Sequence, residues 1–197
     1  MAYPTVSAPY GLKPINRLDG LPYAGATRQM KIPSGYATAI FNGDLVSVVT
    51  AGTVAKFAGT DTGSPVGVFV GCSYTNPSTK QKLYAQNWPS GTVAADAVAY
   101  VVDDPNAVFK VAVTSALGVM DDAAQASIGS NMALVQGAGN ANTGNSGVSL
   151  AAGTEAVTAT LPIRVIDVVR DTATGADAFP EVIVKINTHQ YNSTTGV

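Results

Sequence analysis

Short runs of β-branched and aromatic residues, most of them flanked by glycine, proline or asparagine, constrain the fold of this chain more than any other feature. A run of this length and composition is typical of a β-strand, and the flanking residues are typical of turns. Many short strands joined by such turns favour an all-β barrel or sandwich. We therefore expect a mainly β fold of short antiparallel strands, with the clearest runs at residues 45–49, 54–57, 66–70, 97–102, 108–113, 158–169 and 181–188.

Three segments add detail to this expectation. Asn42-Gly43 precedes the run at 45–49, and Asn-Gly is the strongest short-range signal of a β-hairpin. Residues 121–134 begin with two aspartates and carry several alanines, which predicts one short α-helix. Residues 136–153 consist mostly of small and polar residues and carry no charge, which predicts an exposed loop.

The first 26 residues differ from the rest of the chain. They contain prolines at positions 4, 9, 14 and 22, and proline disfavours helix because it fixes φ and removes the backbone N–H donor. We therefore expect an extended N-terminal arm over residues 1–26, followed by a single β-rich domain over residues 27–197. Because such an arm cannot form a core by itself, we expect it to lie on another surface.

Tyrosines and cations gather in and beside this arm. Tyrosine and arginine are enriched at protein interfaces, because they combine a large contact area with directional hydrogen bonds. Binding of nucleic acid would need a denser basic patch with stacking aromatic residues at one site. We therefore expect the arm to contact a protein partner, and the candidate contact residues are Tyr3, Tyr10, Lys13, Arg17, Tyr23 and Arg28.

Charged residues make up only 12% of the chain, about half of the roughly 25% that is usual in soluble domains. A net charge of −2 gives no general attraction to nucleic acid or to an anionic membrane. No apolar run approaches the roughly 20 residues that span a bilayer. We therefore expect neither a nucleic-acid partner nor a membrane partner. Because charge supports solubility, so little of it suggests that copies or partners cover much of the surface.

Residues that carry catalysis or bind metals are sparse. The only histidine is His189 and the only cysteine is Cys72, and a small buried thiol is favoured over a Cys–His dyad. These two residues cannot supply the four ligands of a closed zinc site. The paired aspartates at 103–104 and 121–122 are typical of a turn and of a helix N-terminus. We therefore expect no enzymatic activity, no metal site and no cofactor.

Five segments follow one another in a familiar order: residues 8–14 (APYGLKP), 34–44 (SGYATAIFNGD), 67–75 (GVFVGCSYT), 87–89 (NWP) and 99–106 (AYVVDDPN). Together they resemble head decoration proteins, also called capsid cement proteins, of tailed bacteriophages. Beyond about residue 113 the chain shares only the general β pattern.

This resemblance implies a β-barrel or β-tulip body with an arm that lies on the capsid, and it brings no catalytic residue with it. It implies a virion protein on the capsid exterior that is assembled in the host cytoplasm. The implied partner is the major capsid protein, whose neighbouring subunits would be bridged and stabilised against the pressure of packaged DNA. A homo-oligomer is implied as well, with a trimer favoured over a dimer.

Two other classes of function stay open at this point. The chain is also compatible with another virion structural protein, such as a tail or head-completion protein. A host-surface or carbohydrate-binding β module is the second alternative, because β-barrels with a tryptophan such as Trp88 and tyrosine-rich loops can bind sugars. The fold class by itself does not decide between these functions.

Overall fold

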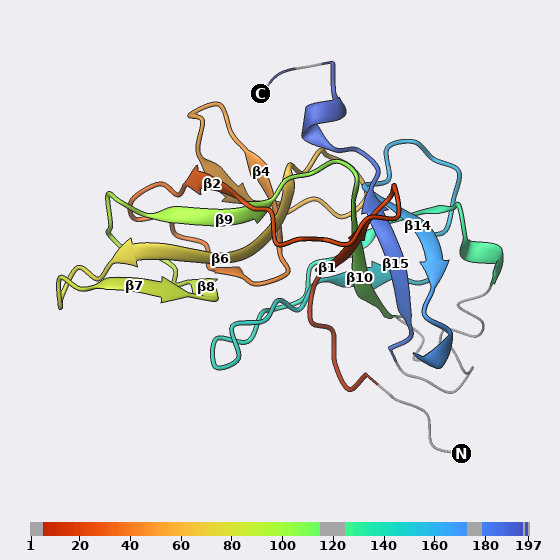
Figure 1. The fold of residues 1–197 in the computed structure, drawn as a ribbon, viewed down its shortest axis with the longest axis horizontal. Helices are drawn as coiled ribbons and strands as arrows, with labels where there is room; N and C mark the ends of the chain where they lie inside the picture. Colours follow the sequence, from red (N-terminus) through yellow and green to blue (C-terminus); the bar gives the residue numbers. More distant parts are fainter. Residues whose placement is uncertain (1–5, 115–124, 173–178, 195, 197) are drawn as a thin grey trace.

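The β-branched runs form two main sheets and one strand pair in the computed structural model, which describes residues 6–114, 125–172, 179–194 and 196 (Figure 1). Strand makes up 40% of the structure and helix 5%, so the expected mainly β fold is confirmed. The first sheet consists of β1 (Lys13–Arg17), β10 (Ala107–Thr114), β11 (Asn131–Met132), β12 (Leu134–Val135), β13 (Ser149–Ala151), β14 (Ile163–Val168) and β15 (Glu181–Ile186). The second consists of β2 (Arg28–Lys31), β4 (Leu45–Val48), β5 (Val54–Lys56), β6 (Gly67–Thr75), β7 (Lys82–Ala85) and β9 (Val98–Val102). The remaining elements are the pair β3 (Ile40–Phe41) and β8 (Asn87–Trp88) and three 3₁₀ turns, η1 (Gln125–Ser127), η2 (Arg170–Thr172) and η3 (Gln190–Asn192).

The first sheet curls into a nearly closed barrel. Its order is β11-β14-β15-β10-β13-β12, with β1 added beside β10. The two end strands, β11 and β12, are separated in sequence by Ala133 alone, and the Ala151 amide of β13 donates a 3.0 Å hydrogen bond to the Ala133 carbonyl. One bent segment therefore supplies both ends of the sheet. The interior is filled by fully buried apolar side chains, among them Phe109, Leu150 and Ile163.

The second sheet separates two hydrophobic cores. Its order is β2-β9-β6-β4-β5, and β7 also pairs with β6. Successive side chains of a strand point to opposite faces. In β6, Val68 therefore enters the barrel core while Phe69 enters a second core, and in β9 Val102 and Val101 are divided in the same way. The second core also holds the fully buried Trp88.

The N-terminal segment is extended, as its proline content predicts, and it lies along the barrel of its own chain. Strand β1 pairs antiparallel with β10, with Lys13 opposite Lys110. The Gly11 amide donates to the Val148 carbonyl (3.1 Å) and the Leu12 amide donates to the Gly43 carbonyl (2.9 Å). The Leu12 side chain is fully buried in the barrel core. Residues 11–17 therefore cover a surface of their own chain.

A buried carboxylate joins the segments that meet between the two sheets. Asp44 has no exposed surface; its Oδ2 atom accepts from the Phe41 amide (2.8 Å) and lies 3.0 Å from Lys56 Nζ. Its Oδ1 atom accepts from Ser146 Oγ (2.6 Å), which in turn accepts from the Val148 amide (2.9 Å). Asp44 therefore connects the turn before β4, strand β5 and the loop before β13.

The hairpin expected at Asn42-Gly43 is wrong, although a turn is present. The Asp44 amide donates to the Phe41 carbonyl (2.9 Å), but β3 pairs with β8, and β4 pairs with β5 and β6. The Gly43 amide donates to the Phe69 carbonyl (2.8 Å) instead of to a hairpin partner. These longer-range partners direct the two flanking strands into different sheets.

The expected helix over residues 121–134 begins among residues that lie outside the described part of the chain. In the described part of that range, η1 is a single turn, and β11 and β12 follow it. Gly129 has a φ of +88° and separates the turn from the strands. The fully buried Met132 belongs to the barrel core, so tertiary packing overrides the local helix propensity here.

The exposed loop expected over residues 136–153 is shorter than predicted. Residues 136–147 form a loop, whereas Val148 and Leu150 are buried in the barrel core and Leu150 belongs to β13. The loop also reaches the strand pair, since Asn145 forms a bridge with Asn42. Its two arms approach so closely that a Cβ atom at Gly137 would lie 2.0 Å from the Gly147 carbonyl oxygen. The small residues of this loop therefore permit close packing.

Replacing Asp44 with asparagine tests the buried connection. Asp44→Asn removes the charge that Lys56 and Ser146 face, and breaking one side of a buried ion pair costs about 3 kcal/mol or more. We expect the free energy of unfolding, measured by urea denaturation, to fall by about 3 kcal/mol. The matched control is Asp61→Asn, because Asp61 is exposed and bonded to Thr60 Oγ1, and it should change stability by less than about 0.5 kcal/mol. Equal effects of the two substitutions would contradict this role of Asp44.

Candidate partner-binding surface

Tyr10, one of the predicted contact residues, is engaged within its own chain. Its hydroxyl donates to the carboxylate of Glu181, which is buried in β15. Lys110 Nζ lies 3.0 Å from Glu181 Oε1 and 5.8 Å from the centre of the Tyr10 ring. Burial and the hydrogen bond to Glu181 raise the pKa of Tyr10. These contacts fasten the segment before β1 to the barrel.

Lys13 has a similar internal role. Its Nζ atom donates to Asn42 Oδ1 (2.6 Å) and to Asn145 Oδ1 (3.1 Å). Partial burial lowers the pKa of Lys13. The ammonium group thus holds β1, the turn before β4 and the 136–147 loop together. Neither Tyr10 nor Lys13 offers its polar group to a partner in this arrangement.

Two of the other predicted residues meet at one turn. Arg17 Nε lies 3.2 Å from Asp104 Oδ2, and Arg28 forms an ion pair with Asp103. Both aspartates lie in the turn between β9 and β10. The Arg28 guanidinium carbon also lies 5.6 Å from the centre of the Tyr191 ring. The structure therefore brings together Arg17 of the arm, Arg28 of β2, the acidic pair and the C-terminal segment.

Two exposed leucines lie in the turn beside this cluster. Leu18 and Leu21 are 46% and 56% exposed, and they flank Asp19 and Gly20, whose φ is +82°. Asp19 Oδ1 accepts from the Leu21 amide (3.1 Å). The Leu18 amide donates to the carbonyl of Asn106 (2.8 Å), so the loop after β1 lies against the connection from β9 to β10 (Figure 1). We call this region the turn surface, and it comprises Arg17, Leu18, Leu21, Arg28, Asp103, Asp104 and Tyr191.

The remaining predicted residues do not belong to the turn surface. Tyr23 is partly buried against the barrel core, and its hydroxyl donates to the Ala26 carbonyl (3.1 Å). Tyr3 lies outside the described residues. Leu18, Leu21 and Tyr191 were not among the residues predicted from the sequence, although two leucines on either side of an Asp-Gly turn are a visible signal of an exposed apolar pair.

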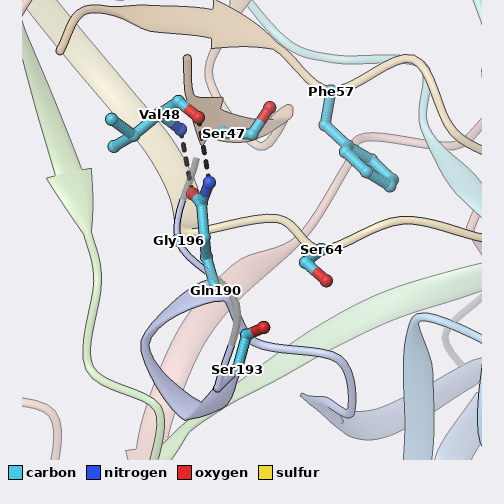
Figure 2. Close-up of a pocket in the computed structure, with 7 residues that line it drawn as sticks. All are labelled: Ser47, Val48, Phe57, Ser64, Gln190, Ser193 and Gly196. Atoms are coloured by element: carbon cyan, nitrogen blue, oxygen red, sulfur yellow. Dashed lines mark hydrogen bonds between the residues drawn. The ribbon is translucent and has the colours of Figure 1, made fainter. Parts of the chain in front are cut away.

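Gln190 fastens the C-terminal segment to the second sheet. Figure 2 shows the Gln190 amide facing the backbone of Val48: the Val48 amide donates to Gln190 Oε1 (3.0 Å), and Gln190 Nε2 donates to the Val48 carbonyl (2.9 Å). The backbone N–H of Gln190 also donates to the Pro65 carbonyl (2.9 Å). The last β6-side bond to β4 runs from the Val66 amide to the Val46 carbonyl (2.7 Å), and beyond it the Gln190 side chain pairs with both backbone groups of Val48.

The pocket beside this glutamine has a volume of about 380 Å³ and is lined by Ser47, Phe57, Ser64 and Ser193, among others (Figure 2). None of the described residues that line it is acidic or basic. Gln190, Ser193 and Gly196 supply part of the lining, so the pocket lies where the C-terminal segment meets β4.

The other residues considered for chemistry are buried. Cys72 is a buried thiol, as expected, and its burial raises its pKa to about 12. Trp88 is fully buried and its Nε1 atom donates to the Tyr36 carbonyl (3.3 Å), so its ring is not available to stack on a sugar. Within the described residues, no group of three or more His, Cys, Asp or Glu side chains is placed to hold a metal ion.

Comparisons with protein-family models, with curated proteins and with solved structures found no match to this chain. Among the described residues, no helix has the length and apolar character needed to cross a membrane.

His189 makes the attachment of the C-terminal segment dependent on pH. It is 1% exposed, and its Nδ1 atom accepts from the Tyr191 amide (3.1 Å). Burial lowers the pKa of His189 below its ordinary value of 6.5, although Asp103 and Asp104 act in the opposite direction. The folded state therefore favours the neutral ring. Its stabilising contribution is complete above about pH 6.5 and is lost as the pH falls below that value.

We expect the free energy of unfolding to decrease by up to about 1.4 kcal/mol per pH unit below pH 6.5 because of this residue. The comparison variant is His189→Asn, since asparagine can accept the same type of backbone hydrogen bond but does not titrate. Urea denaturation of both proteins between about pH 7.5 and 5 should show that the free energy of unfolding falls more steeply with decreasing pH in the parent protein than in the variant. Parallel pH profiles would contradict the role of His189.

Proposed function

We propose that this protein is a structural virion protein that binds the outside of an assembled phage capsid and cements neighbouring major capsid subunits. In this role it acts as a homo-oligomer, with a trimer favoured, and it has no catalytic activity or cofactor. The proposal draws on the resemblance of residues 8–14, 34–44, 67–75, 87–89 and 99–106 to head decoration proteins. Its place of action is the exterior of the head, after assembly in the host cytoplasm.

The turn surface is the observation that carries this proposal. Leu18 and Leu21 expose apolar area on a turn, while Arg17 and Arg28 beside them are paired with carboxylates. Protein interfaces commonly combine an apolar centre with a polar rim, and apolar anchors dominate their affinity. Because the neighbouring charges are paired with each other, the two leucines can be buried against a partner without leaving an uncompensated charge.

The proposed mechanism is thermodynamic. A protein that binds the assembled shell and not its separated subunits stabilises the shell by mass action. The capsid is a symmetric lattice, so the same contact is repeated at many equivalent positions and the contributions add. A rigid body suits this function, and β1, held by Tyr10 and Lys13, contributes to that rigidity.

Substitution of both leucines tests the proposed function. The double variant Leu18→Ser/Leu21→Ser should bind expanded, undecorated heads of the phage that encodes the chain about 30-fold more weakly, because it loses about 2 kcal/mol of apolar burial. Binding is measured by co-sedimentation, together with the resistance of the heads to heat. The matched control is Val157→Ser, since Val157 is 99% exposed and lies between β13 and β14, and it should bind like the parent protein.

Two outcomes would contradict the proposal. If the parent protein does not sediment with the heads and does not raise their heat resistance, the cement function is wrong. If the parent protein binds but the double variant binds equally well, the turn surface does not make the contact. Unfolding measurements on each variant should show changes below about 0.5 kcal/mol, because exposed substitutions rarely cost more.

A further inference from the structure

Strand β2 forms an open edge of the second sheet. It pairs with β9, at the end of the order β2-β9-β6-β4-β5. The Ile32 amide donates to the Ala97 carbonyl (3.1 Å), and the backbone groups of alternate residues in an antiparallel strand point to alternate sides. The peptide groups of Arg28 and Met30 therefore face β9, while those of Gln29 and Lys31 face away from it.

The side chains on this strand leave the edge accessible. Arg28, Gln29 and Lys31 are exposed, whereas Met30 packs against the second core. Lys31 forms no ion pair with any described residue. The charge of Arg28 is compensated by Asp103, so Lys31 is the residue of this strand that presents a cation without a carboxylate partner among the described residues. The outward row of N–H and C=O groups is therefore bordered by the Lys31 ammonium group.

A second copy of β2 is a poor occupant of this edge. The β2 sequence Arg-Gln-Met-Lys contains no carboxylate that could pair with Lys31 of another copy, and like charges on paired strands are destabilising. The N-terminal strand of the chain is not available either, because β1 pairs with β10. The charge of the edge instead complements an extended segment that carries carboxylates.

We propose that the β2 edge is a site for strand addition by an extended, acidic segment of the capsid partner. This inference rests on the proposed function. Backbone hydrogen bonds to Gln29 and Lys31 would supply affinity and fix the register of the added strand, as in other cases of β-strand addition. Aspartate or glutamate side chains on the added strand would pair with Lys31 and would favour the acidic segment over other extended chains.

The test uses a proline that removes an outward N–H group and leaves the inward ones in place. Gln29→Pro removes the N–H that faces away from β9, and proline is tolerated in edge strands at such a position. Its matched control is Gln29→Ala, which shortens the same side chain but keeps the N–H. In co-sedimentation with expanded heads, Gln29→Pro should bind at least about tenfold more weakly than the parent protein, and Gln29→Ala should bind like it.

A charge reversal provides a second, independent variant. Lys31→Glu keeps the backbone N–H but should weaken binding, and it should reverse or abolish the loss of binding that rising salt causes in the parent protein. If a lowered melting temperature shows that Gln29→Pro disturbs the fold, the binding of Lys31→Glu to the heads tests the proposed strand addition instead.

The outcomes separate this inference from the proposed function. If the parent protein and both β2 variants bind equally well, the cement function holds and strand addition at β2 is wrong. If the parent protein itself fails to bind the heads, the cement function is wrong and the inference falls with it. Weakened binding of Gln29→Pro and Lys31→Glu, with normal binding of Gln29→Ala, is the result that the inference requires.

Discussion

The arrangement of the two sheets depends on the buried carboxylate of Asp44. A charge without access to water is tolerated when it has a counter-ion and hydrogen-bond donors, and Asp44 obtains these from Lys56, Phe41 and Ser146. These donors come from three different segments, so satisfying the carboxylate fixes their relative positions. The neighbouring Gly11–Gly43 approach, where a Cβ atom at Gly11 would lie 2.6 Å from the Gly43 oxygen, then allows the N-terminal segment to lie against the barrel, where β1 pairs with β10.

Part of the charge of this chain is paired within its own fold. Lysine and arginine side chains on both sheets are paired with carboxylates of the same molecule, in the ion pairs Arg17–Asp104, Arg28–Asp103, Lys56–Asp44, Lys82–Asp96 and Lys110–Glu181. A composition of 12% charged residues therefore leaves still less charge for long-range attraction to a partner. Contacts through apolar side chains and through the backbone of an edge strand suit such a surface better than long-range charge attraction does. The exposed leucines of the turn surface and the edge of β2 both lie near Arg28.

Local sequence patterns predicted the strands well and their partners poorly. The alternating run at 181–188 contains β15 (Glu181–Ile186), because alternation is a property of the strand itself. The Asn42-Gly43 signal predicted a turn correctly but not the hairpin, because the Gly43 amide bonds to distant Phe69. The contact residues in the arm were chosen by residue type. Only the fold reveals that Tyr10 and Lys13 face Glu181 and two asparagines, and that Arg17 and Arg28 share the acidic turn.

The N-terminal segment is a built-in strand of the barrel, and the proposed partner contacts therefore lie at the turn surface and the β2 edge. Hydrogen–deuterium exchange of the free protein tests this placement of the N-terminal segment most directly. The amides of Gly11 and Leu12, bonded to the carbonyls of Val148 and Gly43, should exchange about as slowly as the amides of β10. Exchange of these two amides at the rate of an unstructured peptide would show a free arm and would contradict the account.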